Sequence, residues 1–264
     1  MYKIIACDLD ETLIGKNRII SEENKAAIRK CHELGIKFVP ATGRGYMTVQ
    51  GTLEDLGLKD LKDEYVISFN GGAISENCGN KVMEFTGISF DFASELYRRG
   101  LEYDVCIHVY TKDKVYAYNL NEDEARYVKG RQEMIEVFDK NLDFLKGQEI
   151  VKCLYERPDY DYLRKIEEDL KPITGDSDVS YSSGRYIEFN KKGVNKGAGL
   201  VKLAGKLGVD IKDTIAIGDN FNDLSMIKAA GLGVGVNNTA EDMKQFCDVI
   251  TDADCDHGAV AEVI

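Results

Sequence analysis

Short apolar runs alternate with amphipathic stretches along the first 70 residues of the chain. The continuously apolar runs, which predict buried strands, are residues 2–8, 36–42 and 65–70. Between them, residues 21–35 and 46–57 have the apolar spacing of helices, and Ser21 is placed to cap the first of these. Buried strands that alternate with helices predict a parallel sheet with helices on both faces.

The pattern changes after residue 72, where apolar and polar residues alternate within pairs of short segments. This alternation predicts hairpins over residues 72–86 and 105–120 and further strands over residues 149–156 and 178–184. Helical spacing is present at residues 91–99, 122–138 and 159–170. From RYIEFN at residue 185 the first pattern returns, with helices expected at 195–208, 222–231 and 240–246 and strands at 213–219, 232–236 and 247–251. The sequence therefore predicts a Rossmann-like α/β core of residues 1–81 plus 185–264, interrupted by an inserted α+β domain of residues 82–184.

Composition and charge narrow the classes of partner. The 264 residues are 44% hydrophobic and 30% charged, as in globular proteins, and the formal net charge is −12. Nucleic acids and anionic membrane surfaces bind cationic faces, so we expect neither as a partner. No apolar run could cross a bilayer and MYKIIACDLDE lacks the form of a signal peptide, so a cytoplasmic location is expected. A small anionic substrate would need local cations or a metal. The sequence predicts no oligomeric state.

Polar side chains gather where the strands of the predicted parallel sheet end. In such sheets, ligands bind beyond the carboxyl ends of the strands. Lys196 begins the helix that follows RYIEFN. The other polar residues are Asp8 and Asp10 after the first strand, Thr42, Gly43 and Arg44 after the second, Asn70 after the third, and Asp219, Asn222 and Asp223 after residues 213–218. Because separate segments place these groups at one edge of the sheet, we expect a single site there.

The carboxylates of this edge predict a metal ion. Like charges at contact distance raise one another's pKa, so these aspartates could not all be ionised together without a cation. Oxygen ligands without a nearby histidine or cysteine favour a hard ion such as Mg²⁺. A metal with Lys196 and Arg44 beside it suits a phosphoryl group.

Four motifs make the chain similar to the haloacid dehalogenase (HAD) superfamily of phosphatases. They are DLDET at residues 8–12, ATGR at 41–44, Lys196 in GVNKG, and GDNFND at 218–223. The long insertion between ATGR and the lysine resembles the Cof-type branch, whose class IIB α/β cap domain is inserted at that point. Glu11 stands where many relatives have glycine.

The resemblance implies a role for each residue of the motifs. Asp8 would be the nucleophile that becomes an aspartyl phosphate, and Asp10 the acid that protonates the leaving oxygen and the base that later activates water. Thr42 would donate a hydrogen bond to the phosphoryl group, and Lys196 would pair with both Asp8 and the phosphate. The metal ligands would be Asp8, the backbone carbonyl of Asp10 and Asp219, supported by Asp223 behind them. The remaining contacts with substrate or phosphate would be Gly43, Arg44, Asn70 and Asn222.

The resemblance therefore predicts a Mg²⁺-dependent hydrolase of small phosphomonoesters, in particular sugar phosphates. A phosphomutase on the same core is the alternative enzyme. An alternative of another class is a non-catalytic Mg²⁺-binding phospho-receiver module, which also has an acidic cluster and a lysine at the edge of a parallel sheet. An inserted cap argues for an enzyme, because a receiver does not need a lid over its site.

Overall fold

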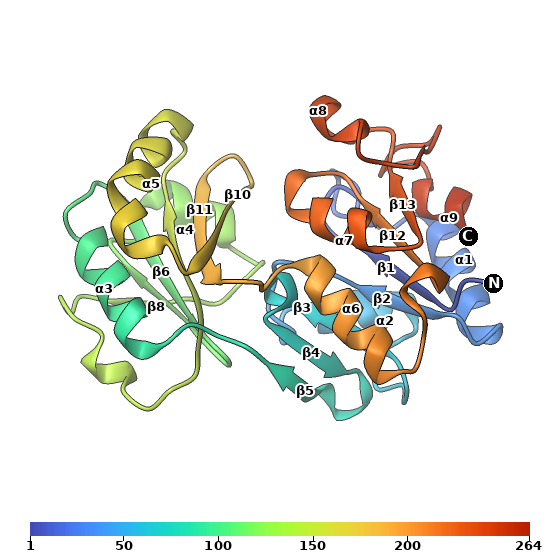
Figure 1. Ribbon diagram of the computed structural model, residues 1–264, viewed down its shortest axis with the longest axis horizontal. Helices are drawn as coiled ribbons and strands as arrows, with labels where there is room; N and C mark the ends of the chain where they lie inside the picture. Colours follow the sequence, from blue (N-terminus) through green and yellow to red (C-terminus); the bar gives the residue numbers. More distant parts are fainter. The chain divides into compact units, whose positions relative to one another are not determined.

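The computed structural model describes residues 1–264, and the chain divides into two compact units. The first unit contains Met1–Phe85 and Asn195–Ile264, and the second contains Thr86–Val194 (Figure 1). We call the first unit the core and the second unit the cap. The sequence analysis ended the first core segment at residue 81, four residues before Phe85. It ended the inserted domain at residue 184, ten residues before Val194.

The core is built on a parallel sheet with the strand order β14-β13-β12-β1-β2. These strands are β1 (Ile4–Cys7), β2 (Lys37–Pro40), β12 (Thr214–Gly218), β13 (Leu232–Gly235) and β14 (Val249–Ile250). In the middle, β1 pairs with β12 on one side and with β2 on the other, so that Cys7 is opposite both Ile217 and Pro40. The loops after these three strands therefore begin at the same edge of the sheet.

Helices cover both faces of this sheet, which confirms the predicted fold class. They are α1 (Glu22–Glu33), α2 (Gln50–Leu56), α6 (Lys196–Lys206), α7 (Leu224–Ala229), α8 (Glu241–Lys244) and α9 (Ala259–Val263). Successive side chains of β1 point to opposite faces of the sheet. Ile5 packs in the apolar cluster with α1, α2 and α9, and Ile4 packs in the cluster with α6 and α7. The Ser21 side chain accepts a hydrogen bond from the Asn24 N–H, which confirms the predicted cap of α1.

A small antiparallel sheet completes the core. It consists of β3 (Tyr65–Ser68), β4 (Ala73–Glu76) and β5 (Lys81–Phe85), in that order. β3 pairs antiparallel with β4, and it also lies parallel beside the segment that follows β2, through a bridge between Ala41 and Ile67 and a 2.9 Å hydrogen bond from the Thr42 N–H to the Ile67 carbonyl. Short 3₁₀ helices are η1 (Phe69–Gly71), η2 (Cys78–Asn80), η4 (Ile211–Asp213) and η5 (Phe221–Asp223).

The cap is a six-stranded sheet in the order β10-β11-β9-β6-β7-β8. The strands are β6 (Cys106–Thr111), β7 (Val115–Tyr118), β8 (Ile135–Val137), β9 (Ile150–Glu156), β10 (Ser177–Ser182) and β11 (Tyr186–Lys191). The helices are α3 (Phe90–Gly100), α4 (Glu122–Val128) and α5 (Tyr160–Thr174), with the 3₁₀ helix η3 (Asp143–Leu145). One face of the sheet packs against α3 and α5 in a single apolar cluster (Figure 1).

Two sequence-based assignments in this region were wrong. RYIEFN was predicted to return the chain to the core, but it forms β11, which pairs with β9 and β10 of the cap. Residues 122–138 were predicted as one helix, but α4 ends at Val128 and β8 follows, paired in parallel with β7. No helix of either unit combines the length and the apolar character that a membrane crossing requires.

Candidate active site

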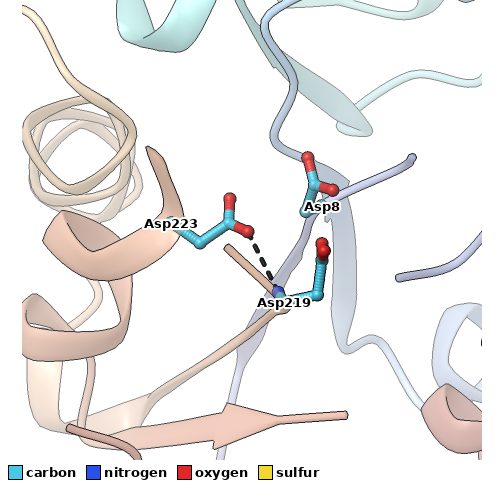
Figure 2. A group of neighbouring side chains, drawn as sticks. All are labelled: Asp8, Asp219 and Asp223. Atoms are coloured by element: carbon cyan, nitrogen blue, oxygen red, sulfur yellow. Dashed lines mark hydrogen bonds between the residues drawn. The ribbon is translucent and has the colours of Figure 1, made fainter. Parts of the chain in front are cut away.

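The register of the parallel sheet brings Asp8 and Asp219 together. The Asp8 N–H continues the ladder and donates to the Ile217 carbonyl at 2.9 Å. Because Cys7 is opposite Ile217, the carboxylates that follow the two strands emerge side by side. Ligand atoms of Asp8, Asp219 and Asp223 all lie within 4.8 Å of one another (Figure 2). The structure thus joins three of the predicted aspartates in one buried cluster.

Lys196 neutralises part of this cluster. It is the first residue of α6, whose N-cap is Asn195, and its side chain is fully buried. The Lys196 ammonium donates to an oxygen of Asp8 and, at 2.6 Å, to Asp223 Oδ1. Burial alone would lower the pKa of Lys196, but the carboxylates of Asp223 and Asp8 outweigh it and raise that pKa. The lysine therefore stays charged and fixed between the two aspartates.

Asp223 is held from two sides. Its Oδ2 accepts hydrogen bonds from the backbone N–H groups of Asp219 at 3.1 Å, drawn as the dashed line in Figure 2, and of Asn220 at 3.2 Å. At Gly218 a Cβ atom would lie 2.5 Å from the Asp223 Cβ, so glycine is required at that position. Since the oxygens of Asp223 are engaged by protein donors, this residue supports the cluster from behind.

The remaining carboxylates fit a hard cation. Burial, with the Asp223 charge second, raises the pKa of Asp219 to about 7, and burial raises the pKa of Asp8 well above its usual range. Lys196 donates to Asp8 Oδ1 and Thr12 donates to Asp219 Oδ1. The protein gives no hydrogen bond to the Oδ2 atom of either aspartate. Two carboxylate oxygens without a protein donor, on largely buried side chains and with no nitrogen or sulfur donor among the clustered ligands, match the preference of Mg²⁺.

Thr12 is a site residue to which the sequence analysis gave no role. Its hydroxyl donates to Asp219 Oδ1 at 2.7 Å in the buried cluster. This bond fixes the orientation of the Asp219 carboxylate. The position was visible as the last residue of DLDET, but nothing in the sequence indicated which partner the hydroxyl would reach.

Asp10 and Arg44 form a pair of their own. Arg44 Nε donates to Asp10 Oδ2 at 2.8 Å, and Arg44 Nη2 donates to Asp10 Oδ1. The side chain of Asp10 is 55% exposed and that of Arg44 is 31% exposed. Neighbouring Glu11 has a φ of 62°, in the left-handed region that favours glycine. The conformation at Glu11 is therefore one that glycine would adopt without strain.

The loop after β2 places Thr42, Gly43 and Asn70 together. The Asn70 N–H donates to the Thr42 carbonyl at 2.9 Å, and a Cβ atom on Gly43 would lie 3.2 Å from Asn70 Oδ1. Thr42 Oγ1 accepts from the Arg44 N–H at 3.1 Å. Asn222 lies on η5 next to Asp223 and makes no hydrogen bond to the aspartate cluster.

The comparisons with known proteins identify the class. A family model described as haloacid dehalogenase-like hydrolase matches residues 5–264. The chain therefore belongs to this family, as its motifs predicted.

Several of its relatives are named as phosphatases. The chain is 30% identical over 262 residues to the 5-amino-6-(5-phospho-D-ribitylamino)uracil phosphatase YcsE of Bacillus subtilis, covering 99% of this chain and 94% of YcsE. A HAD-like hydrolase of Bacteroides thetaiotaomicron has a TM-score of 0.85 and 30% identity, covering 100% of this chain and 98% of its own. The HAD subclass IIB sugar phosphatase BT4131 shares the fold, with a TM-score of 0.85, 20% identity and coverage of 99% and 97%. The protein is a HAD-family phosphatase, which decides against the receiver module.

Proposed function

We propose that the protein is a Mg²⁺-dependent hydrolase of small phosphomonoesters that carries the phosphoryl group transiently on Asp8. The observation that carries this proposal is the environment of Asp8. Lys196 holds one carboxylate oxygen of Asp8, Oδ2 has no protein donor, and the carboxylates of Asp8 and Asp219 approach within 4.8 Å of each other. A nucleophile needs this combination of fixed orientation and an available oxygen.

The Mg²⁺ site would use Asp8, Asp219 and the backbone carbonyl of Asp10, with Asp223 behind them. The Asp10 carbonyl accepts no hydrogen bond from the backbone, so it can serve as a ligand. When bound, Mg²⁺ supplies positive charge beside the phosphoryl oxygens and so stabilises the transition state.

The remaining steps belong to the side chains of the chain itself. An Asp8 oxygen forms a bond to phosphorus, the bond from phosphorus to the leaving oxygen breaks, and Asp10 gives its proton to that oxygen. Asp10 then takes a proton from water, whose oxygen attacks the same phosphorus, so that inorganic phosphate leaves and Asp8 is restored. Because Thr42 Oγ1 already accepts from the Arg44 N–H, its hydroxyl hydrogen can point to a phosphoryl oxygen. Asn222, Gly43 and Asn70 remain proposed contacts with the phosphate or substrate.

The proposed substrates are sugar phosphates and related polyol phosphates. YcsE is named for a substrate with a phospho-D-ribityl group, which is a phosphate on a polyol chain. We assign the choice of leaving group to the cap, Thr86–Val194, because the site residues described above all belong to the core.

Two aspartate variants test the mechanism. Asp8→Asn should abolish turnover, because an amide is too weak a nucleophile. Asp10→Asn should release close to one equivalent of nitrophenol from p-nitrophenyl phosphate in a burst and then stall, because p-nitrophenolate leaves without an acid while the aspartyl phosphate lacks its base. Mass spectrometry should locate one added phosphate on Asp8. Equal loss of activity on sugar and nitrophenyl esters, without a burst, would contradict the role of Asp10.

Metal removal and product analysis test the remaining parts of this proposal. EDTA should abolish turnover, and Mg²⁺ but not Ca²⁺ should restore it, because the larger coordination of Ca²⁺ misplaces the phosphoryl group. Full activity after exhaustive dialysis against EDTA would refute the metal assignment. Release of inorganic phosphate from a singly phosphorylated sugar separates the hydrolase from a phosphomutase, which would return the phosphoryl group to a sugar.

A chain in which a short glycine-serine linker replaces residues 86–194 tests the cap. It should still bind Mg²⁺, measured by calorimetry, but lose discrimination within a panel of sugar phosphates. Unchanged relative rates across the panel would show that the cap does not choose the leaving group.

A further inference from the structure

The bidentate pair between Arg44 and Asp10 occupies the groups that the mechanism needs. Each Asp10 carboxylate oxygen accepts a hydrogen bond from the Arg44 guanidinium. An acid and base must exchange its proton with the leaving oxygen or with water through those same oxygens. The pair, as it stands, therefore keeps Asp10 from its proposed task.

Arg44 reaches Asp10 from a fixed backbone. The Arg44 N–H donates to Thr42 Oγ1 at 3.1 Å, and the Arg44 carbonyl accepts from the Phe69 N–H at 2.9 Å. The backbone around Asp10 is fixed in the same way. The Glu11 N–H donates to the Ile14 carbonyl at 3.0 Å, and the Ile14 N–H donates to the Leu9 carbonyl at 2.7 Å. Only the side chains can separate, and both reach solvent, with exposures of 31% for Arg44 and 55% for Asp10.

The other cation of the site cannot take part in such an exchange. Lys196 is fully buried and donates to both Asp8 and Asp223. Moving it would leave two buried carboxylates without their counter-charge, whereas solvent can replace the partners of the partly exposed Arg44–Asp10 pair, so separating that pair costs less. An arriving phosphoryl dianion offers several oxygens in the geometry that a guanidinium fork matches.

The geometry points to Arg44 as a substrate-binding residue whose guanidinium leaves the Asp10 carboxylate and binds the phosphoryl group of the arriving substrate. Asp10 is then released as acid and base only when a substrate is bound. This inference rests on the proposed function, since it takes Asp10 as the acid and base of phosphoester hydrolysis.

Phosphate binding tests the exchange without turnover. The affinity for inorganic phosphate is measured by calorimetry in saturating Mg²⁺ for the wild-type protein, Asp10→Asn, Arg44→Met and the double variant. Asp10→Asn should bind phosphate about two- to fivefold tighter, because the charge that competes for Arg44 is gone. The gain should disappear when Arg44 is methionine. If the gain is equal in both backgrounds, Asp10 only repels phosphate and the exchange is refuted.

The dependence of kcat on the leaving group distinguishes two roles of Arg44. Arg44 either releases Asp10 when substrate binds or holds Asp10 in place during proton transfer. Phenyl and p-nitrophenyl phosphate are aryl esters that differ only in the para nitro group, and phenolate leaves less readily and depends more on an acid. In Arg44→Met the KM for both esters should rise about tenfold, while the ratio of their kcat values stays as in the wild-type protein. Arg44→Lys should recover part of the affinity. Arg29→Met, which removes an exposed arginine of α1 outside the site, should change neither quantity.

A selective fall in kcat for phenyl phosphate would overturn the exchange, because Arg44 would then be needed to hold Asp10 during proton transfer. If the wild-type protein turned over no phosphomonoester at all, the proposed function would fail instead. The phosphate-binding measurements would still decide whether Arg44 passes from Asp10 to the anion.

Discussion

Replacing Glu124 by glutamine should stabilise the cap at neutral and alkaline pH. Glu124 lies on α4 and its side chain is fully buried. Its Oε1 accepts from the Tyr186 hydroxyl at 2.7 Å, and its Oε2 lies 3.2 Å from Arg185 Nε. Burial raises the pKa of Glu124 from 4.5 to about 7 even though Tyr186 and Arg185 act in the opposite direction. The folded cap thus prefers the neutral form of this side chain.

The size of the effect follows from that pKa. A difference of one pKa unit corresponds to about 1.4 kcal/mol, so the rise from 4.5 to about 7 means that holding an ionised Glu124 in the folded cap costs up to about 3–4 kcal/mol. Because the folded state binds this proton more tightly than the unfolded chain, wild-type stability falls as the pH rises from 4.5 to about 7. Glutamine is neutral throughout and keeps an oxygen for Tyr186. The two proteins should therefore be similar in stability at pH 4.5 and differ most above pH 7.

His108 acts in the opposite direction and provides an internal check. Its Nε2 lies 3.6 Å from Glu124 Oε1, and burial, with the charges of Lys152 and Arg185, lowers its pKa from 6.5 to about 3. The stability due to neutral His108 is therefore lost as the pH falls below 6.5. Between pH 4.5 and 6.5, a rise in pH therefore lowers the stability of the wild-type cap through Glu124 and raises it through His108. In Glu124→Gln only the pH dependence due to His108 remains of these two, so the stability of the cap should rise with pH across that interval.

The cap contains its own reporters for this measurement. Cys106 and Cys153 are fully buried and are the only cysteines between residues 86 and 194. Pulsed labelling in urea with a dipyridyl disulfide, which reacts with thiols in acid, followed by peptide mass spectrometry therefore reports the unfolding of the cap alone. Glu156→Gln is the matched control. Glu156 is equally buried and accepts from Arg185 and Asn121, both at 2.8 Å, so its loss should lower stability at pH 8. A Glu124→Gln variant that is less stable than wild type at pH 8 would refute the reasoning.

Three substitutions in the core test its packing and its charges. Lys196→Met should abolish activity and lower the stability of the core in EDTA by about 3–5 kcal/mol, measured by urea unfolding, because Asp8 and Asp223 lose their buried counter-charge. Thr12→Val should weaken Mg²⁺ binding about tenfold in calorimetry, since Asp219 loses the bond that orients it; unchanged affinity would contradict this role. Gly71→Ala should lower the urea midpoint, because a Cβ atom would lie 2.3 Å from the Asn195 carbonyl oxygen at a φ of 94°. An unchanged midpoint would show that the loop relaxes without cost.

The core site was predictable because strand ends are visible in the sequence. Apolar runs that stop at a carboxylate locate Asp8 and Asp219, and parallel pairing then requires the two to meet. Even the capping role of Ser21 followed from local chemistry. These are short-range signals that tertiary contacts reinforce.

The errors occurred where long-range pairing decides the outcome. In β11 the apolar Ile187 and Phe189 face the helices of the cap, while Tyr186 and Glu188 alternate with them, so the strand has the period of a sheet with one polar face. The core assignment ignored this alternation. Residues 135–137 follow a helical pattern, but pairing with β7 overrides it. No sequence signal of this kind could connect Arg44 with Asp10, since their contact depends on two loops meeting.

The two cations of the site differ in what their surroundings allow. Lys196 begins a helix, is fully buried and bonds two buried carboxylates, so its charge stabilises the unliganded cluster and cannot leave it cheaply. Arg44 follows a strand, is 31% exposed and pairs with a carboxylate that solvent also reaches. Because screening weakens such a pair, its charge can be transferred to a ligand at small cost. A site of this kind keeps its nucleophile in place with the buried cation and leaves the response to substrate to the exposed one.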